Sequence, residues 1–493
     1  MDPRRRLDVP LGAGPARIAF VIPPTGLYCR EDRCQSRFRF DLIPTQRAPL
    51  EECEAAGAIR AAGGTPFVVD APAEGLSDAA VLARLAKIRP DLVVLVTTFG
   101  SLDFDLGWAK RIRDALPAAK IAARGTPALI HAEAILAEAP DLDFCVQGEY
   151  ELVFGDLVHA APDRVAGVIL RSAGGGTQGA PAPYARDLDA LPRAARDVVD
   201  GRRYRVRGLG APQATVRVQR GCPFPCSYCL VGRVSGSEAR HRSPKSIAEE
   251  LADLCAEGTR HFYLRADTFS LDRAWALETS RAIGRLAPEA RWVTTTRVEC
   301  VDDALVAAMA DGGCYGLSFG IDVGSREIGE RVGKRPDLTR ADRAMRACDR
   351  AGVLSLGYFM IGFLWDTPGT IAETTRFARE VRPDLLTIHF AHPYPGTRYH
   401  AQVRAAGRRI ESVEAQSTPA FATGGLSREA LERAAREMLF RHYLDPRVVA
   451  SIARKSARLA VDRSWRAVAR SFARSRVGRP SIAAGVEAPR ASR

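Results

Sequence analysis

The chain has 493 residues, of which 46% are hydrophobic and 26% are charged. This composition is close to the globular average and excludes wholesale disorder, a collagen-like fibre and a disulfide-stapled miniprotein. No apolar run approaches the roughly 20 residues that a membrane-spanning helix needs, and the apolar stretch at residues 18–22 is too short for a signal peptide. We therefore expect a cytoplasmic protein, possibly peripheral at the inner membrane surface.

The formal net charge is +13, and it is unevenly distributed along the chain. Residues 441–493 hold 13 Lys and Arg against 3 Asp and Glu, a net charge of +10, so the preceding residues carry only +3. Because the basicity belongs to one end of the chain, the body need not bind a polyanion. We expect no nucleic-acid partner.

The first third of the sequence alternates short apolar segments with helix-like segments. We expect strands at residues 18–22, 66–70, 92–96, 120–123 and 144–146, and helices at 50–62, 78–87, 106–116 and 128–138. This alternation predicts an α/β domain at residues 16–160 with a doubly wound, Rossmann-like or flavodoxin-like parallel sheet. No G-x-G-x-x-G follows the first strand, which disfavours dinucleotide binding. Residues 161–205 are rich in Gly, Ala and Pro and are expected to form a linker with one short strand pair.

The same rhythm returns between residues 206 and 420. We expect strands at 215–218, 261–264, 291–295, 316–320, 355–361 and 385–390, separated by helices at 244–257, 272–286, 303–311, 340–351 and 370–382. Six strand–helix steps predict a partial, TIM-like (β/α)6 barrel. Functional sites in such folds lie at the C-terminal ends of the strands.

Residues 421–480 are predicted to be helical and basic, and residues 481–493 to be a disordered tail. One apolar stripe with the spacing i, i+4, i+7 and i+11 is formed by Val461, Trp465, Val468 and Phe472. Arginines repeat with a similar period on another face of the same expected helix. A basic amphipathic helix of this kind favours contact with an anionic membrane surface over packing on the barrel. Nucleic-acid binding is the third interpretation.

Three of the eleven cysteines lie within eight residues, directly after the first strand of the second domain. Cys222, Cys226 and Cys229 have the spacing C-x3-C-x2-C. Three soft thiolate ligands suit an iron–sulfur cluster and leave one iron open to a small molecule. A structural zinc site would need a fourth ligand, and the nearest candidate, His241, lies twelve residues further on. The cluster of cysteines therefore predicts an iron–sulfur site.

This loop closely resembles the signature of the radical S-adenosylmethionine (SAM) enzymes. The resemblance implies a 4Fe–4S cluster on the three cysteines, with the methionine part of SAM on the open iron. One-electron reduction of SAM then yields a 5′-deoxyadenosyl radical. Tyr228 matches the aromatic position that packs near the adenine. A reducing partner such as a flavodoxin or ferredoxin is implied as well.

The resemblance continues to about residue 397 and suggests further SAM contacts. Asp267 matches the position near the methionine amino group, and Arg297 the position near the methionine carboxylate. Asp322 and Ser325 lie in a segment, Gly-Ile-Asp-Val-Gly-Ser, that resembles the family's Gly-x-Glu-Ser-Gly-Ser. The segment has Asp in place of Glu and Val in place of Ser. Residues 357–362 and 392–397 resemble the glycines of the fifth strand and the Pro-x-Pro-Gly-Thr that closes the sixth.

A doubly wound domain before such a barrel is similar to the cobalamin-binding class of this superfamily. Residues 147–151, Gln-Gly-Glu-Tyr-Glu, resemble the Gly-Glu-x-Glu that ends the cobalamin domain, and residues 124–127 resemble its Gly-Gly-x-x turn. The resemblance implies cobalamin at the strand ends, and the candidate contacts are Thr97, Thr98, Gly125, Thr126 and Glu149. D-x-H-x-x-G, the motif that supplies a lower-axial histidine, is absent. The alternative is a domain that keeps the fold and has lost the cofactor.

The predicted function is a cobalamin-dependent radical SAM enzyme that modifies an unactivated carbon, with C-methylation of a hydrophobic natural product or lipid favoured. No catalytic acid or base is assigned. One alternative is cyclisation or ring rearrangement without methyl transfer. Another is a methylthiotransferase, whose second cluster would take three ligands from Cys29, Cys34, Cys53 and Cys145. A non-enzymatic, cluster-bearing sensor or scaffold is the last alternative.

Overall fold

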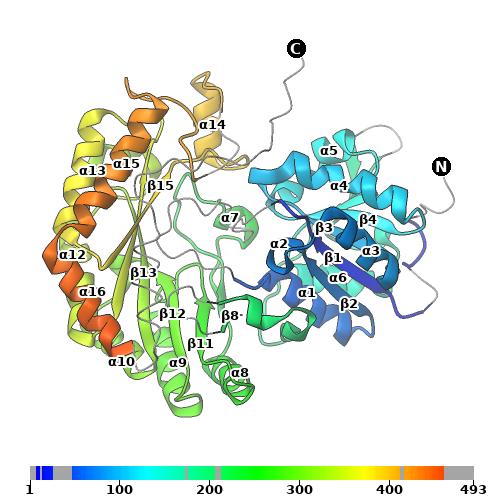
Figure 1. Ribbon diagram of the computed structural model, residues 1–493, viewed down its shortest axis with the longest axis horizontal. Coiled ribbons are helices and arrows are strands. Elements are labelled where there is room, and N and C mark those ends of the chain that lie inside the picture. Colours follow the sequence, from blue (N-terminus) through cyan, green and yellow to red (C-terminus); the bar gives the residue numbers. More distant parts are fainter. Residues whose placement is uncertain are drawn as a thin grey trace.

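The computed structural model describes residues 7–11, 14–25, 47–172, 176–205, 212–410 and 416–459. The chain forms two α/β units side by side, one from the blue and cyan part of the sequence and one from the green to orange part (Figure 1). Each unit has its own sheet with helices packed on it, as the alternation in the sequence predicts. No helix of the described residues is both long and apolar enough to cross a membrane.

The first sheet has seven strands in the order β2-β1-β3-β4-β5-β6-β7. Its strands are β1 Arg17–Ile22, β2 Thr65–Asp70, β3 Leu92–Val96, β4 Lys120–Arg124, β5 Phe144–Val146, β6 Val168–Arg171 and β7 Thr177–Gln178. The first five are parallel, whereas β6 and β7 form an antiparallel extension. The short strand pair expected in the linker is thus present, but it continues the first sheet past residue 160. Val168 and Leu170 explain this, because both are buried in the core of the first unit.

Helices cover both faces of the first sheet, and each face has its own apolar core. They are α1 Leu50–Ala61, α2 Ala71–Glu74, α3 Asp78–Ile88, α4 Leu102–Ala115, α5 Thr126–Glu138 and α6 Tyr150–Leu157. Helix α4 begins four residues before the predicted start at residue 106. Asp103 and Asp105 lie in its first turn, where acidic side chains favour the positive end of a helix.

The second sheet has six parallel strands in the order β15-β14-β13-β12-β11-β8, which confirms the partial barrel. They are β8 Gln213–Arg217, β11 His261–Arg265, β12 Arg291–Thr296, β13 Cys314–Asp322, β14 Leu354–Ile361 and β15 Leu385–Phe390. A small antiparallel pair, β9 Gln219–Arg220 and β10 Arg240–His241, flanks the three cysteines. The strand order follows the chain, so all six C-terminal ends lie on one side of the sheet.

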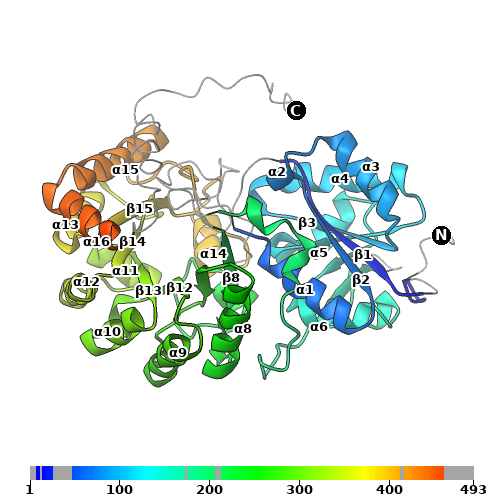
Figure 2. The same ribbon diagram turned by 60° about the horizontal axis from the view of Figure 1, so that its bottom comes forward.

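The barrel helices pack on the outside of this sheet (Figure 2). The expected ones are α8 Pro244–Ala256, α9 Arg273–Leu286, α10 Asp303–Asp311, α12 Leu338–Ala351 and α13 Pro368–Val381. Three short helices lie in the loops after strands, namely α7 Val231–Val234, α11 Arg326–Val332 and α14 Arg398–Ala405. The sequence patterns did not predict these three.

Two further helices, α15 Arg428–Tyr443 and α16 Pro446–Leu459, follow the barrel and pack on its side. Helix α16 is held by Lys455, whose buried ammonium group lies 2.6 Å from an oxygen of Asp384. The expected helical region is therefore present up to residue 459. The amphipathic stripe at residues 461–472 and the tail lie outside the described residues.

Candidate active site

The cysteine loop, defined as residues 221–230, is tied to the end of the neighbouring strand β11. The amide of Gly221 donates to Asp267 Oδ2 at 2.7 Å, and the Gln219 side chain accepts from the amides of Asp267 and Thr268 at 2.7 and 3.1 Å. Gly221 has φ +87°, and an added Cβ would meet the Glu238 carbonyl oxygen at 1.9 Å. Only glycine therefore fits the turn that begins the loop.

The other end of the loop is held by the helices after β13 and β15. The Ser227 amide donates to the Val332 carbonyl at 2.9 Å, and the Ser227 carbonyl accepts from Tyr399 at 2.9 Å. Arg398 donates to the Pro225 carbonyl at 2.5 Å. A loop fixed from both sides can present its side chains without reorganising, which favours ligand binding.

The three cysteine thiols are free, and none of them is fully buried. Cys222 Sγ lies 3.5 Å from Thr268 Oγ1, and the guanidinium of Arg297 lies 3.6 Å from Cys226 Sγ. Desolvation, followed by Cys226, Asp267 and Cys222, raises the pKa of the Cys229 thiol. The donor set thus consists of three free thiols on one loop within electrostatic reach of one another, which suits a ligand that disperses their negative charge.

Within the described ranges, no three His, Cys, Asp or Glu side chains converge closely enough to hold one metal ion. In a cubane cluster each thiolate binds a different iron atom, so three thiols on one loop fit a 4Fe–4S cluster with one iron left open.

Two of the predicted SAM-binding residues stand at the ends of adjacent strands beside the loop. Asp267 follows β11 and accepts from the Gly221 amide, as described above. Arg297 follows β12, and its guanidinium stacks 3.8 Å from the ring centre of Phe224 and donates to Glu299 at 2.6 Å. Burial would lower the pKa of Arg297, but Glu299 and Cys226 outweigh it and raise that pKa. The guanidinium is therefore a permanent positive charge next to the cysteines.

The other predicted residues gather where β13 ends. The hydroxyl of Tyr228 donates to Asp322 Oδ2 at 2.7 Å, and Lys334 Nζ lies 2.6 Å from the same oxygen. Asp322 has φ +66°, a left-handed conformation that is uncommon for non-glycine residues and often marks a functional site. Ser325 is fully buried, and its hydroxyl has no hydrogen-bond partner among the described residues. Asp267, Arg297 and Asp322 thus contact the cysteine loop, to which Tyr228 belongs, and Ser325 follows β13 by three residues. The contact of these five residues with SAM stays a prediction.

In the first unit, the predicted cobalamin contacts form what we call the first-domain edge, the ends of β3 and β4. The hydroxyl of Thr97 donates to the Arg124 carbonyl at 2.8 Å. Gly125 has φ +117°, and a Cβ there would meet the Thr97 carbonyl oxygen at 2.3 Å. Thr98 and Thr126 are buried beside them. The side chains at this edge are small, and their contact with cobalamin stays a prediction.

Glu149, the remaining predicted cobalamin contact, points to the barrel instead. Its carboxylate lies 2.8 Å from Arg240, 3.2 Å from Arg220 and 2.7 Å from the Ala185 amide. Desolvation alone would raise the pKa of Glu149, but these partners outweigh it and lower that pKa. Its observed role is an ion pair between the two units, and a direct contact with cobalamin stays a prediction.

The Glu149 contacts are part of a larger group of buried ion pairs between the units that the sequence did not reveal. Arg220, two residues before the first cysteine, also pairs with Glu151. Beside it, Arg217 donates to Glu54 at 2.8 Å and Arg265 to Glu51 at 2.5 Å. We call these four arginines and four glutamates the interdomain ion-pair group; its members are Arg217, Arg220, Arg240, Arg265, Glu51, Glu54, Glu149 and Glu151. The only sequence signal was charge at positions where apolar residues were expected.

An apolar contact joins the first-domain edge to the cysteine loop. Leu230, directly after Cys229, and Tyr394, after β15, are buried together with Phe99 and Ile130 of the first unit packed against them. The ring centres of Phe99 and Tyr394 lie 5.7 Å apart. In Figure 1, helix α7, which follows the loop, lies between the two units. The strand ends of both sheets therefore meet at the cysteine loop.

Two histidines, one from each unit, flank these rings. His131 lies 6.2 Å from Phe99 between ring centres, and His392 lies 4.8 Å from Tyr394. Burial lowers the pKa of His392 to about 4, and desolvation lowers the pKa of His131. Both imidazoles are therefore uncharged near neutral pH. His392 was only part of a family motif in the sequence, and His131 carried no signal.

Comparison with known proteins agrees with this arrangement. Residues 216–378 match the Radical SAM superfamily. The chain is 27% identical to an uncharacterized methyltransferase of Pyrococcus horikoshii over 78% of this chain and 82% of that protein. It is 26% identical to an anaerobic magnesium-protoporphyrin IX monomethyl ester cyclase of Cereibacter sphaeroides over 71% of this chain and 59% of the cyclase.

A solved structure with a similar fold is that of a radical SAM methyltransferase, TsrM, from Kitasatospora setae with cobalamin and a [4Fe-4S] cluster bound. The TM-score is 0.63 at 16% identity, and the similarity covers 80% of this chain and 76% of TsrM. Residues 216–378 thus match a Radical SAM domain, and the fold of the chain is similar to that of TsrM. The predicted enzyme class and cofactor set agree with these relatives.

Proposed function

We propose that this enzyme is a cobalamin-dependent radical SAM methyltransferase that methylates an unactivated carbon of a hydrophobic small molecule. The observation that carries the proposal is the meeting of the two strand-end edges at the cysteine loop, through Leu230, Tyr394, Phe99 and Ile130. When bound, the cofactors supply a carbon-centred radical from SAM at the cluster and a transferable methyl group on cobalamin. A substrate between the two edges would be within reach of both.

The chain's own residues bind and orient in this scheme. Cys222, Cys226 and Cys229 would hold the cluster. Asp267 and Arg297 provide opposite charges for the two ends of an amino acid, such as the methionine part of SAM. Both charges are pre-positioned, Asp267 by the Gly221 amide and Arg297 by Glu299.

On the other side of the loop, Tyr228, Asp322 and Lys334 form a hydrogen-bonded group that can orient the adenosine part of SAM. The buried hydroxyl of Ser325 has no partner among the described residues and could donate to the same ligand. At the first-domain edge, Thr97, Thr98, Gly125 and Thr126 would support the corrin ring. Leu230 and Tyr394 exclude water from the space between the edges, which protects a radical.

The test is a mass comparison of small-molecule and lipid extracts from a deletion strain and its parent, each grown with methyl-labelled methionine. Complementation with the Cys226→Ala variant is the matched control. Methyl transfer predicts that the deletion strain accumulates a compound one CH2 unit lighter and that the parent's product carries the label. An unlabelled product, or an accumulated isomer, would contradict methyl transfer.

Cyclisation or ring rearrangement without methyl transfer is the second candidate. The likeness to the protoporphyrin ester cyclase favours it, since the identity to that relative, 26%, is close to the 27% found for the methyltransferase. The radical half of the site would serve both reactions. The unlabelled product in the experiment above is the result that would support this candidate.

A methylthiotransferase would need a second cluster in the first unit, and two of its four candidate ligands do not suit this. Cys53 and Cys145 are buried, and desolvation raises the pKa of each thiol to about 12. Cys29 and Cys34 lie outside the described residues. In the chain, the barrel is followed by the helices α15 and α16, whereas methylthiotransferases have a small β domain at that position. An iron content near eight per chain instead of four would revive this alternative.

We further propose a lipid or similar hydrophobic acceptor, and a flavodoxin or ferredoxin as the reducing partner. Aromatic and aliphatic side chains at the meeting point of the two edges support an apolar acceptor. Peripheral contact with the inner membrane surface would give the enzyme access to such a molecule. A cytosolic location follows from the same proposal, because the donors of low-potential electrons are soluble proteins of that compartment.

A further inference from the structure

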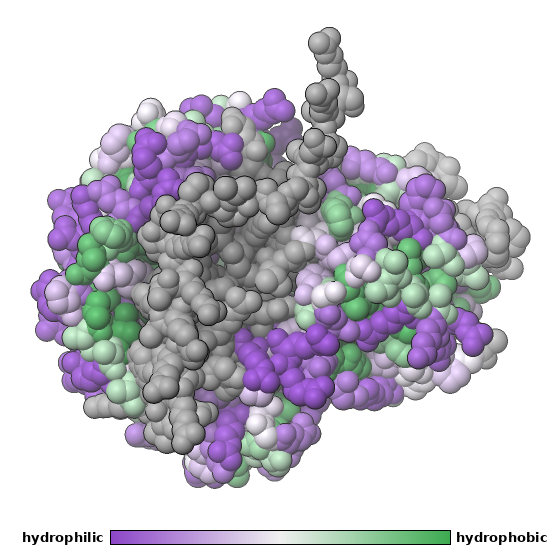
Figure 3. Space-filling model, in the orientation of Figure 1, coloured by the Kyte–Doolittle hydropathy of each residue, from purple (hydrophilic) through white to green (hydrophobic). Residues whose placement is uncertain are grey.

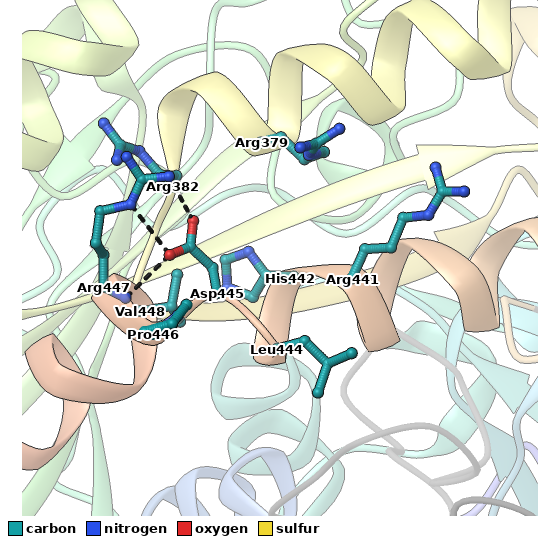
Figure 4. A pocket seen from close by; sticks show the side chains of 9 residues that line it. All are labelled: Arg379, Arg382, Arg441, His442, Leu444, Asp445, Pro446, Arg447 and Val448. Atoms are coloured by element: carbon teal, nitrogen blue, oxygen red, sulfur yellow. Dashed lines mark hydrogen bonds and ion pairs between the residues drawn. The ribbon is translucent and has the colours of Figure 1, made fainter.

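A second polar site lies on the outer side of the barrel, where α13 ends and α15 turns into α16. An open cavity of about 590 Å³ is lined by Arg379 and Arg382 from one side and by the segment from Arg441 to Val448 from the other (Figure 4). We call it the arginine pocket. None of its lining residues belongs to the candidate active site.

The arginine pocket carries excess positive charge. Four arginines line it against a single aspartate, Asp445. Asp445 is occupied by Arg447, which donates two side-chain hydrogen bonds to it at 3.1 and 2.9 Å, and Arg441 pairs with Glu437 outside the pocket. Arg379 and Arg382 form no ion pair in the part of the chain that the structure describes, although Arg382 is close enough to Asp445 to help lower the pKa of that carboxyl. The pocket is therefore electrostatically incomplete without an anion.

A buried histidine completes the lining. His442 is only 3% exposed, and its Nε2 has no hydrogen-bond partner among the described residues. Desolvation lowers the pKa of His442 to about 4, and backbone hydrogen bonds with Asp384 and Pro383 offset this only in part, so the ring is neutral near pH 7. A buried polar nitrogen without a partner is costly, and a water held by the anion would satisfy Nε2 in either tautomer.

The walls of the pocket are fixed by contacts with the barrel. Asp384, two residues after Arg382, accepts from Lys455 and Ser451 of α16 at 2.6 Å each. The hydroxyl of Tyr443 accepts from the Leu386 amide at 2.9 Å. Arg382 itself caps α13 in a left-handed conformation with φ 47°. These contacts hold the helix ends, and hence the arginines, in place before any ligand arrives.

Exposed apolar side chains border the arginines. Phe440, Leu444 and Val449 are 57%, 62% and 51% exposed. They are three of the seven exposed large hydrophobic residues in the described chain, and they fall within ten positions of one another. Leu444 lines the pocket, and Phe440 lies one turn before it on α15. In Figure 3, hydrophobic side chains interrupt the hydrophilic surface on the side where α15 and α16 lie.

We propose that the arginine pocket binds a phosphate group attached to an apolar molecule. Guanidinium groups match phosphate geometry, and the bordering Phe440, Leu444 and Val449 suit a hydrocarbon part. Two sources share this chemistry, the headgroup of an anionic phospholipid and a free phosphate ester. The strongly basic sequence that follows α16 adds attraction to an anionic membrane surface, the first of these sources.

The experiment compares the full chain with the double variant Arg379→Gln, Arg382→Gln. Flotation with vesicles of phosphatidylcholine and phosphatidylglycerol tests the lipid source, and pure phosphatidylcholine vesicles are the lipid control. Thermal unfolding with and without glycerol 3-phosphate tests the soluble source. Arg376→Gln, on an exposed position of α13 outside the pocket, is the matched control variant.

Binding to the phosphatidylglycerol vesicles alone, about 30-fold weaker in the double variant, supports the lipid source, and Leu444→Ser should then weaken it as well. A rise in the unfolding temperature with glycerol 3-phosphate, lost in the double variant, supports the soluble source. Equal behaviour of the double variant, Arg376→Gln and the wild type in both assays overturns the proposal. SAM cleavage by the double variant should equal that of the wild type, which separates this test from that of the proposed function.

Discussion

The two strand-end edges that meet at the cysteine loop are built differently. On the barrel side, polar side chains that follow successive strands bond to the cysteine loop: Asp267 accepts from the Gly221 amide, and Asp322, paired with Lys334, accepts from Tyr228. On the first-domain side, Thr97 bonds to its neighbouring backbone, and Gly125 allows a close backbone approach. The barrel edge thus carries charged side chains at fixed positions, whereas the first-domain edge has small residues and a close approach of two backbone segments. Ligands with charged ends suit the first kind of edge, and a broad flat ring suits the second.

The largest effect should come from the cysteine loop itself. Cys226→Ala removes one of three thiols, so the variant should lose the cluster and all SAM cleavage above background. Iron and sulfide content after anaerobic reconstitution, together with 5′-deoxyadenosine release, measures both. Cys255→Ala on α8 is the control, because that half-buried cysteine lies outside the loop and should leave both readings unchanged.

Breaking the interdomain ion-pair group should cost stability. Arg220→Gln leaves Glu149 and Glu151 without their shared partner in a buried place. Removing one partner of a buried ion pair costs about 3–5 kcal/mol. Urea unfolding should show a lower midpoint for this variant than for Arg326→Gln, which removes only an exposed pair with Glu330 on α11. Equal midpoints would mean that the group does not hold the two units together.

Acid should weaken the junction between the edges through His392. Its pKa is about 4 in the folded chain, well below the ordinary value near 6.5. Between these values the unfolded chain binds a proton that the folded chain does not, so stability falls as the pH drops from 6.5 to 4. This single histidine accounts for about 3 kcal/mol. His392→Asn should flatten the fall in unfolding free energy, and an unchanged slope would refute the assignment.

The smallest expected effect tests the shape of the first-domain edge. Gly125→Ala places a Cβ against the Thr97 carbonyl and strains a left-handed residue, which should destabilise the protein by about 1–3 kcal/mol. The same variant should also retain less cobalamin, which is read from the absorption spectrum of the purified protein. Gly107→Ala is the control. Nothing lies within 4 Å of its new Cβ in helix α4, so it should be neutral or stabilising by about 0.5–1 kcal/mol. Equal cobalamin retention in both variants would contradict a corrin site at this edge.

Much of the fold could be predicted because its strands are apolar runs with clear limits. Strands β3, β5 and β15 and helix α10 have the predicted bounds. The short helices α11 and α14 were missed, since seven or eight residues give too little periodicity, and their N-terminal residues Ser325 and Thr397 were interpreted only as motif positions. Of these two N-cap residues, only Thr397 caps its helix with its side chain, which accepts from the His400 amide, and the functional interpretation hid that cap.

The site was predictable to a different degree on its two edges. Around the cysteine loop, family resemblance predicted Tyr228, Asp267, Arg297, Asp322 and Ser325, and the structure places Asp267, Arg297 and Asp322 against the loop that contains Tyr228. The ion pairs of Glu149 could not be predicted, because its partners Arg220 and Arg240 are 71 and 91 residues away in the sequence. Pairings over such distances depend on how the units dock, which no local pattern encodes.

The most direct test of the central claim, that a cluster edge and a corrin edge meet in one enzyme, is the cofactor content of the anaerobically reconstituted full chain. The account predicts about four irons and about one cobalamin per chain, with cobalamin lowered in Gly125→Ala and iron unchanged there. Four irons without cobalamin, under conditions that supply it, would contradict the account and leave a first domain that kept its fold without its ligand.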